Sequence, residues 1–398
     1  MAIKRFSFID KFHCWTLEEM SFSPLNLLVG KSGAGKTNIL KALKSIHLAG
    51  ISGARQANGC EWVIEIESEK TKFLWEAEVS LVAETGLTQF MDSNEDVHVS
   101  EKQSIEGAYF LKERIIRDEK DKIVDRTEDN FIFKNKQLPK LKNTESAISL
   151  LAEEEDIAPL NKALYRMIFS PNIYVVYVAY PFDISKFNKI RKQYPNLDAL
   201  REARNVRSLV KAYILQEDYP KEFEYIKTDY LDIFDTIKDI KLGRLSELDP
   251  CTLQEAPSTR TEDWLVVGLK EEGVKGWVTS PRISSGMNRI FSHLIDLALA
   301  PPGTVIIIDE VENSLGVNCL PEIIDRFLRR PQGLQFILTS HHPYIIQNIP
   351  SDQWQIVTRK GSTVRVVAAK TIPAIKTNSA HGKFIQLINL KEFEEGIQ

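Results

Sequence analysis

A glycine-rich stretch near the N-terminus has residue types and a spacing suited to binding phosphate. Residues 30–37 read Gly-Lys-Ser-Gly-Ala-Gly-Lys-Thr and fit the pattern G-x-x-x-x-G-K-[ST]. Glycines let backbone N–H groups converge on phosphate oxygens, the lysine neutralises the β- and γ-phosphates, and the threonine hydroxyl is placed to bind Mg²⁺. The stretch therefore predicts a site for a nucleoside triphosphate with Mg²⁺. The predicted binding residues are Gly30, Lys31, Ser32, Gly33, Ala34, Gly35, Lys36, Thr37 and Asn38.

A pair of adjacent carboxylates supplies groups suited to hydrolysis. Asp309 and Glu310 follow residues 304–308, a β-branched run typical of a strand buried on both faces. An aspartate at the carboxyl edge of such a sheet can hold Mg²⁺, and Glu310 is placed to deprotonate a water that attacks the γ-phosphate. Two unrelated surface acids are the weaker interpretation, because a phosphate-binding loop lies upstream.

Two further sites suggest contact with phosphate. His341 ends the next predicted strand, residues 334–340, and is suited to sensing a γ-phosphate. Ser284, Ser285 and Gly286 open a predicted helix, whose hydroxyl and N–H groups can bind phosphate. Since one phosphate-binding loop already serves the chain's own nucleotide, we expect this second corner to face the nucleotide of a partner subunit.

The sequence around the glycine-rich stretch predicts the elements that would position it. Residues 24–29 are short and apolar, as in a buried strand, and residues 38–46 have apolar side chains at helical spacing. Strand, glycine turn and helix form the expected context of a phosphate-binding loop. Phe12 and Trp15 precede this unit; either could stack on a base, although a place in the core is the commoner role for such residues.

These motifs, taken in order, resemble those of ABC-type ATPases of the SMC/RecF/OLD branch, a group of prokaryotic AAA-type ATP-binding proteins. Residues 30–37, 283–289, 306–313 and 339–343 resemble the Walker A motif, the signature, Walker B with the D-loop, and the H-loop. The resemblance implies an α/β P-loop NTPase fold with an ABC-type head, and a head-to-tail homodimer or higher oligomer closed by ATP. It also implies residue roles: Lys36, Glu310 and His341 are catalytic, Thr37 and Asp309 bind Mg²⁺, and Ser285 and Gly286 reach across the dimer.

The chain also departs from that family pattern. Residues 312–317 lack the usual His-Pro, and no Q-loop glutamine can be placed, Gln89 and Gln103 being weak candidates. The 247 positions from Thr37 to Ser284 (284 minus 37) are too few for an SMC coiled coil, and a zinc-hook C-x-x-C is missing. The 57 residues after His341 (398 minus 341) are too few for a Toprim nuclease. We therefore expect any effector to be a separate protein. The resemblance implies that this effector is a nuclease or toxin in anti-phage defence.

The middle of the chain predicts two inserted subdomains. Alternating polar and apolar residues indicate an antiparallel β-rich segment with a hairpin, in which the polar stretch over residues 84–103 is expected to be a loop. Apolar residues at helical spacing indicate a helical segment after it, with helices expected over residues 197–215 and 221–240 among others. Residues 381–389 are amphipathic, suited to packing on the protein's own core or to docking an effector. The expected division is 1–59 with 250–370 for the head, 60–143 for the β-rich subdomain, 144–249 for the helical subdomain, and 371–398 for a C-terminal tail helix.

Composition limits the classes of protein. The 398 residues are 43% hydrophobic, as in a folded protein, and the net charge of −4 argues against non-specific coating of nucleic acid. Four scattered cysteines predict reduced thiols in a cytoplasmic protein. No apolar run approaches the roughly 20 residues that span a bilayer, so we expect no membrane partner.

Direct binding of duplex DNA is the alternative function, as in a RecF-like repair ATPase. Arg201, Arg204 and Arg207 recur at every third position and could line a nucleic-acid surface, although a solvated helix face is the simpler interpretation. A nucleotide-binding subunit of a transporter is disfavoured by the long insertion between Walker A and the signature.

Overall fold

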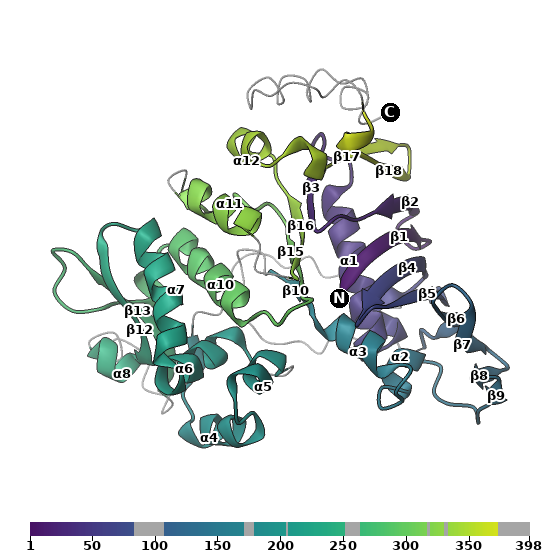
Figure 1. The fold of residues 1–398 in the computed structure, drawn as a ribbon, viewed down its shortest axis with the longest axis horizontal. Helices are drawn as coiled ribbons and strands as arrows, with labels where there is room; N and C mark the ends of the chain where they lie inside the picture. Colours follow the sequence, from purple (N-terminus) through teal and green to yellow (C-terminus); the bar gives the residue numbers. More distant parts are fainter. Residues whose placement is uncertain are drawn as a thin grey trace. The chain divides into compact units, whose positions relative to one another are not determined.

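A computed structural model describes residues 1–82, 107–170, 179–203, 206–250, 263–316, 319–329 and 333–372 of the chain, and it confirms the predicted mixed α/β class (Figure 1). The chain forms two compact units, one of residues 1–168 and 350–398 and the other of residues 169–349. Among the described residues, no helix combines the length and apolar character needed to cross a membrane.

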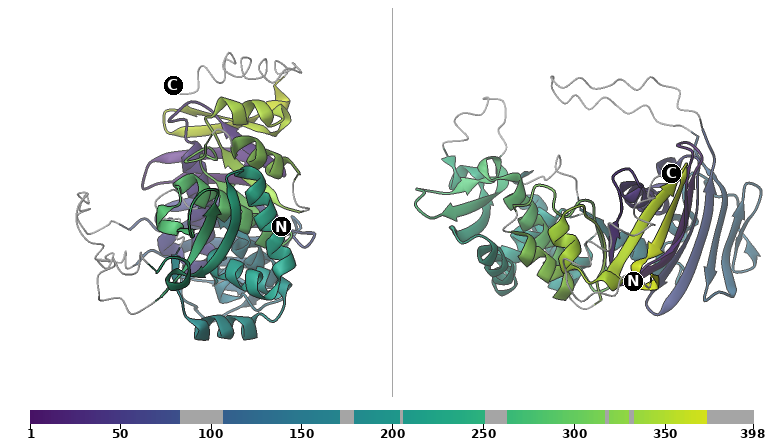
Figure 2. Two further views of the ribbon diagram at one scale, coloured as in Figure 1. Left: turned by 90° about the vertical axis from the view of Figure 1, so that its left-hand side faces the viewer. Right: turned by 90° about the horizontal axis from the view of Figure 1, so that it is seen from above.

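The first unit contains a long sheet built from both ends of the chain. Its strand order is β3-β17-β18-β2-β1-β4-β5-β6-β7-β8-β9. Figure 2 shows the yellow β17–β18 hairpin beside the purple N-terminal strands. The strands are β1 Ala2–Asp10, β2 Trp15–Ser21, β3 Leu25–Val29, β4 Cys60–Ser68, β5 Thr71–Val79, β6 Phe110–Arg117, β7 Asp121–Thr127, β8 Phe131–Phe133, β9 Lys136–Gln137, β17 Trp354–Lys360 and β18 Thr363–Ala368.

The β-rich segment continues the N-terminal sheet. β4 pairs antiparallel with β1, and β5 to β9 follow as successive antiparallel neighbours. The predicted hairpin is present as β6 and β7. The two compact units divide the chain after residues 168 and 349, and these positions are not boundaries of the four-part division expected from sequence. That four-part division stays a prediction.

The helices of the first unit begin with α1, which follows the glycine-rich stretch. Its buried face includes Ile39, Leu43 and Ile46, the apolar residues that predicted a helix here. The helix ends before Gly53, whose φ of +99° suits glycine and whose N–H donates to the Ala49 carbonyl at 3.2 Å. The helices are α1 Lys36–Ser52, α2 Ala147–Leu150 and α3 Ala158–Tyr165, with short 3₁₀ turns at Ala54–Ala57, Ser351–Gln353 and Ala369–Thr371.

A buried charge cluster joins β5, β6, β7 and the start of α2. Glu113 is fully buried, and its carboxylate accepts hydrogen bonds from the Trp75 indole at 3.2 Å and the Ala147 N–H at 2.8 Å. The Ser146 hydroxyl and the Arg126 guanidinium, at 3.3 Å, complete the set. Burial raises the pKa of the Glu113 carboxyl, against the effect of these donors.

His47 ties α1 to α3 and should make stability depend on pH. Its Nδ1–H donates to the Leu164 carbonyl at 2.9 Å, and burial lowers the pKa of the imidazole from 6.5 to about 4. The neutral ring is favoured in the fold, so this contribution is complete above pH 6.5 and is lost as the pH falls towards 4. The loss approaches about 3 kcal/mol, at about 1.4 kcal/mol per pKa unit. Urea unfolding of wild type and His47→Gln at pH 7, 5.5 and 4.5 should give a flatter profile for the variant; parallel profiles would contradict it.

The second unit contains a short parallel sheet and a small antiparallel one. β15 Val305–Ile308 and β16 Gln335–Thr339 are parallel neighbours and fully buried, and β10 Met167–Phe169 lies where the chain passes from the first unit to the second. The antiparallel sheet comprises β11 Ala179–Pro181, β13 Trp264–Glu271 and β12 Ile237–Arg244, with β14 Val278–Thr279 paired to β13. The helices are α4 Ile184–Gln193, α5 Leu197–Glu202, α6 Ser208–Asp218, α7 Pro220–Ile233, α8 Leu245–Leu248, α10 Ser285–Leu299, α11 Leu320–Arg329 and α12 Pro343–Asn348, with a 3₁₀ turn at Ser280–Arg282.

Several element boundaries differ from those predicted. The expected helix over residues 197–215 is two helices, α5 and α6, and the one over residues 221–240 ends at Ile233. Residues 237–244 instead form β12, because their backbone groups pair with β13. β2 was not predicted. The expected loop over residues 84–103, with Gln89 and Gln103, lies outside the described residues, as do Arg204, Cys251 and residues 373–398 of the expected tail helix.

Candidate functional site

The glycine-rich stretch lies between β3 and α1 of the first unit, as predicted. Gly33 and Gly35 have φ values of +83° and +103°, which L side chains rarely adopt. α1 begins at Lys36, whose side chain is buried. Its Nζ donates to the carbonyl oxygens of Gly30 at 2.7 Å and Lys31 at 3.0 Å, so the loop wraps around the ammonium group.

Close backbone packing explains two of the glycines. A Cβ on Gly30 would lie 2.4 Å from the carbonyl oxygen of Val357 in β17, and a Cβ on Gly35 would lie 2.7 Å from Cγ2 of Val364 in β18. The Arg359 guanidinium also donates to the Gly33 carbonyl at 3.4 Å. The β17–β18 hairpin therefore supports the loop from the opposite end of the chain.

The loop and the start of α1 fit a nucleoside triphosphate with Mg²⁺. The N-terminus of a 17-residue helix carries the positive end of the helix dipole and attracts anions. Lys36 and the half-buried Thr37 occupy its first turn, which places an ammonium and a hydroxyl at the same end. An amine for phosphate oxygens and a hydroxyl for a hard divalent ion are the donor types that this ligand needs.

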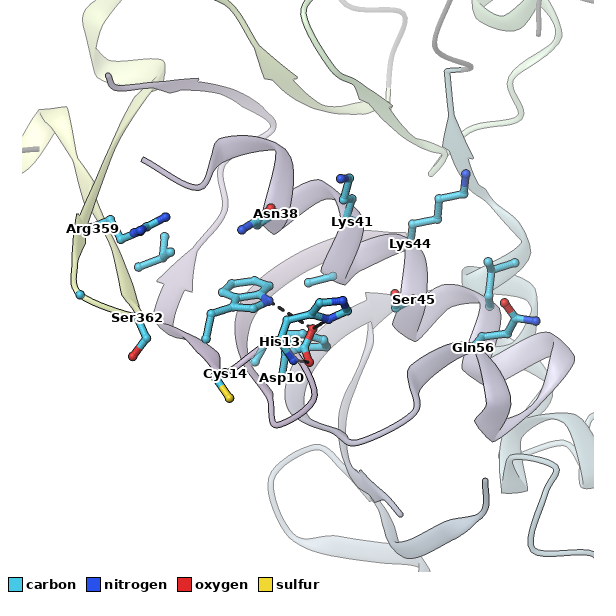
Figure 3. A pocket seen from close by; sticks show the side chains of 16 residues that line it. Asp10, His13, Cys14, Asn38, Lys41, Lys44, Ser45, Gln56, Arg359 and Ser362 are labelled. Carbon is cyan, nitrogen blue, oxygen red and sulfur yellow. Dashed lines mark hydrogen bonds and ion pairs between the residues drawn. The ribbon is translucent and has the colours of Figure 1, made fainter. Parts of the chain in front are cut away.

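A cavity of about 650 Å³ adjoins this loop within the first unit (Figure 3). It lies between α1, the β1–β2 turn and the β17–β18 turn, and its lining includes Asn38, directly after Thr37, and Arg359. A volume of this size accommodates a small-molecule ligand. The remaining lining residues are Phe8, Asp10, His13, Cys14, Trp15, Lys41, Ala42, Lys44, Ser45, Leu48, Gln56, Gly361, Ser362 and Val364.

Asp10 organises the β1–β2 turn at this cavity. Its carboxylate accepts hydrogen bonds from the His13 Nδ1–H at 2.9 Å, the His13 backbone N–H at 2.8 Å and the Trp15 indole at 3.2 Å (Figure 3). Trp15 thus lines the cavity with its indole nitrogen already bound. Phe12 is 43% exposed, so the favoured assignment of this residue to the core is wrong, and Phe12 does not line the cavity either.

The carboxylate pair lies in the second unit, directly after β15. The Glu310 backbone N–H donates to the Thr339 hydroxyl at 2.7 Å, and that hydroxyl donates to Asp309 Oδ1 at 2.6 Å. Thr339 ends β16, so the parallel neighbour of β15 fixes the turn that carries both carboxylates. Glu310 has a φ of +47°, a rarely populated conformation, and its side chain is exposed.

A buried arginine on α10 holds the same turn. Arg289 Nη2 donates to the carbonyl oxygens of Asp309 and Glu310, both at 3.2 Å, and its Nε lies 3.4 Å from His293 Nε2. Burial lowers the pKa of the Arg289 guanidinium, while the carboxylates of Glu312, Glu310 and Asp309 act to raise it. The helix that begins with the signature residues is therefore hydrogen-bonded to the predicted Walker B turn.

The signature residues lie at the start of α10. The Ser284 hydroxyl caps the helix by accepting from the Met287 N–H at 3.2 Å, and Ser285 is exposed beside it. A Cβ on Gly286 would lie 2.2 Å from the Ser314 carbonyl oxygen. The glycine is thus required for close packing of α10 against the predicted D-loop.

His341 follows β16 on the same side of the second unit as the carboxylate turn. Its backbone N–H donates to Glu312 Oε1 at 2.6 Å, and its side chain is exposed. Asn313 Nδ2 in turn donates to Glu310 Oε2 at 3.3 Å. The predicted H-loop is therefore joined to the predicted D-loop by the hydrogen bond from His341 to the Glu312 carboxylate.

The structure brings the predicted residues together in two groups, one per unit. Residues 30–38 form the first group, and Ser284–Gly286, Asp309, Glu310 and His341 belong to the second. Sequence reasoning gave no role to Arg289 or Thr339, although both stand inside motifs that it identified. A lone arginine among the apolar residues of a predicted helix was the available signal for Arg289.

The arginine row offers little support for a nucleic-acid surface. Arg201 forms an ion pair with Asp198 at 3.3 Å, and Arg207 lies over the Tyr180 ring at 5.3 Å. Both groups are thus engaged within the second unit.

The chain is similar to several solved structures and to one protein family. Similar solved structures include an SMC head bound to the C-winged helix domain of ScpA (14% identity, 92% of this chain and 98% of that chain, TM-score 0.46). They also include the SMC head domain from Thermotoga maritima (10%, 92% and 99%, TM-score 0.39). Likenesses of this extent carry no functional conclusion. No curated protein matches the chain. Residues 25–347 match one family along most of the chain, and the protein belongs to that family, described as "AAA domain, putative AbiEii toxin, Type IV TA system".

Proposed function

We propose that the protein is an ATPase that acts as a molecular switch, in which ATP closes a head-to-tail dimer and hydrolysis reopens it. The observation that carries the proposal is the loop around Lys36, a phosphate cradle at the start of a long helix. Membership of an AAA family that spans both motif groups supports the same reading.

The residues of the first unit would bind the nucleotide. Backbone N–H groups of residues 30–38 and the Lys36 ammonium would bind the phosphates, and the adjoining cavity would receive the base and ribose. Thr37 would hold Mg²⁺ together with Asp309, whose orientation Thr339 fixes. Bound Mg²⁺ supplies positive charge against the phosphate oxygens.

Glu310 would accept the proton of the attacking water, and His341 would contact the γ-phosphate. Thr339 and Arg289 hold the backbone of the turn, so the Glu310 carboxylate projects from a fixed base. Both Glu310 and His341 are exposed on the second unit, as groups that meet a ligand must be. This assignment requires the Asp309–Glu310 turn to face the phosphate loop.

The signature residues would complete the site of a second copy. Ser284 caps a 15-residue helix, and Ser285 is exposed at the N-terminus of that helix, where an anion is favoured. Because residues 30–38 would already hold the phosphates of one nucleotide, the proposal assigns Ser284, Ser285 and Gly286 to the nucleotide of the partner subunit. The oligomer would then be a homodimer or a multiple of it.

We further propose that the switch gates a separate effector, a nuclease or toxin, in prokaryotic anti-phage defence in the cytoplasm. The family description names a putative toxin of a type IV toxin–antitoxin system, which agrees with such a role. Direct action on DNA remains the weaker candidate, because Arg201 and Arg207 have partners within their own unit.

ATP binding tests the site assignment. Lys36→Ala should weaken the binding of ATP by at least about 100-fold, because the only side-chain ammonium among residues 32–38 is removed from the phosphates. Lys189→Ala, an exposed lysine on α4, is the control and should bind ATP as wild type does. Isothermal titration of ATP with Mg²⁺ gives the affinities. Equal affinity of Lys36→Ala and wild type would refute the assignment.

A further inference from the structure

Three helices of the second unit, α7, α10 and α11, lie side by side (Figure 1). Their side chains form a groove of about 800 Å³. The aliphatic part of its lining comes from Ile226 on α7, from Leu294, Leu297 and Ala298 on α10, and from Pro321 on α11. Leu297 and Ala298 are only partly buried, so apolar surface remains accessible inside the hollow. A hollow with an accessible apolar lining is typical of an interaction surface.

Tyr225 adds an aromatic side chain to the lining of this groove. It is 70% exposed, the largest exposed fraction among the large hydrophobic side chains of the described residues. Tyrosine is enriched at protein interfaces and among the residues that dominate binding energy. A tyrosine side chain with this exposed fraction does not contribute to the core of the unit.

The polar lining of the groove is acidic. Four carboxylates and two guanidinium groups give a net charge of −2 (−4 plus +2), and they come from Asp229, Asp232, Glu322, Asp325, Arg326 and Arg329. Arg326 pairs with Asp229 at 2.9 Å, and Arg329 pairs with Asp325 at 2.6 Å. Asp232 and Glu322 have no cationic partner among the described residues, so the unmatched charge of the groove is negative.

Glu322 also leaves one hydrogen-bonding position open. Its Oε2 atom is shielded from solvent and has no hydrogen-bond donor within the described part of the chain, and the Nε of the neighbouring Arg326 likewise has no acceptor there. Shielded polar atoms are nearly always bonded in native proteins. A partner that brings a cationic donor to Glu322 would satisfy the carboxylate.

We propose that this groove binds a cationic amphipathic helix of another protein. Apolar side chains on one face of that helix, at i, i+3, i+4 and i+7, pack on the lining around Leu297 and against Tyr225. Lysine or arginine side chains flanking that face pair with Asp232 and Glu322. The negative charge of the groove opposes the binding of nucleic acid. Helix binding at this groove is separate from the proposed ATPase function and needs no nucleotide.

A designed peptide tests the proposal on the 398-residue chain. The probe is a fluorescently labelled peptide of about 15 residues, long enough to form a helix, with leucine at helical spacing and lysine on the flanking positions. A second peptide carries glutamate in place of lysine. Fluorescence anisotropy without nucleotide should show that the lysine peptide binds at least tenfold tighter, and that its affinity falls as salt rises. Tyr225→Ala should weaken binding about tenfold, and Asp232→Asn about threefold.

Matched variants separate the groove from general attraction to a negatively charged protein. Glu224→Gln removes an exposed carboxylate from α7 that does not line the groove, and Val274→Ala trims an apolar side chain that is 44% exposed elsewhere. Both should bind the lysine peptide as wild type does. Lys36→Ala should also bind it normally, so a failed ATP site leaves this test intact.

Three results would overturn the proposal. The first is equal affinity of the protein for the two peptides. The second is that the variants do not single out the groove, either because Tyr225→Ala and Asp232→Asn both leave binding of the lysine peptide unchanged or because Glu224→Gln weakens it as much as they do. The third is tighter peptide binding after deletion of residues 373–398, because the protein's own C-terminal segment would then be the occupant.

Discussion

Glu310→Gln is expected to lower the rate of ATP hydrolysis by about 100-fold or more, the usual contribution of a general base. Glutamine keeps the size and shape of the side chain but cannot accept the proton of the attacking water. The backbone of the turn should be preserved, since its contacts to Thr339 and Arg289 are made by the N–H and carbonyl groups of residue 310. Release of inorganic phosphate over time gives the rate.

ATP affinity is the control for that experiment. Glu310→Gln should bind ATP with Mg²⁺ as tightly as wild type or more tightly, because a negative charge is removed from the neighbourhood expected for the γ-phosphate. Glu247→Gln, on the exposed side of α8, should leave both rate and affinity unchanged. A Glu310→Gln protein that hydrolyses ATP at the wild-type rate would remove Glu310 from the mechanism.

Glu113→Ala is expected to lower the free energy of unfolding by about 3–5 kcal/mol, because it leaves a buried guanidinium without its counter-ion. Arg126 is 2% exposed and also donates to the carbonyl oxygens of Glu145 at 2.7 Å and Lys142 at 2.6 Å. The alanine variant therefore leaves both the Arg126 charge and the hydrogen-bond donors of Glu113 without their carboxylate partner. Urea unfolding followed by circular dichroism measures the change.

A partly exposed ion pair on the same two strands provides the control. Arg114 and Asp125 join β6 and β7 at 3.0 Å with side chains that are 36% and 23% exposed. Asp125→Ala should cost no more than about 1 kcal/mol, as exposed pairs usually do. Replacing both buried partners, in Glu113→Leu with Arg126→Met, should cost less than Glu113→Ala alone. Equal losses for Glu113→Ala and Asp125→Ala would contradict the account of the cluster.

The parts of the site that sequence could predict are contiguous in the chain. Residues 30–37 carry their own glycine conformations and helix start, and Asp309 follows a strand whose apolar run is unmistakable. Arg289 acts on the turn after β15 from a different element, 20 positions away (309 minus 289), and such a contact has no local pattern.

Tertiary pairing explains the larger misses. The predicted continuation of a helix beyond Ile233 to residue 240 is wrong because residues 237–244 form a strand that pairs with β13. β4 continues the N-terminal sheet because it pairs antiparallel with β1, although the whole of α1 lies between these two strands in the sequence. The groove of α7, α10 and α11 combines side chains from three separate helices, so no single stretch of sequence indicates it.

The most direct test of the central claim is the mass of Glu310→Gln in solution with and without ATP. Sedimentation velocity should show a monomer without nucleotide and a dimer with Mg²⁺ and ATP. The reason is that the ATP site formed by residues 30–38 of one copy would be completed by Ser285 and Gly286 of the other. Glu310→Gln combined with Lys36→Ala should stay monomeric under both conditions. An unchanged mass for Glu310→Gln at saturating ATP would contradict the claim that ATP joins two copies of this chain.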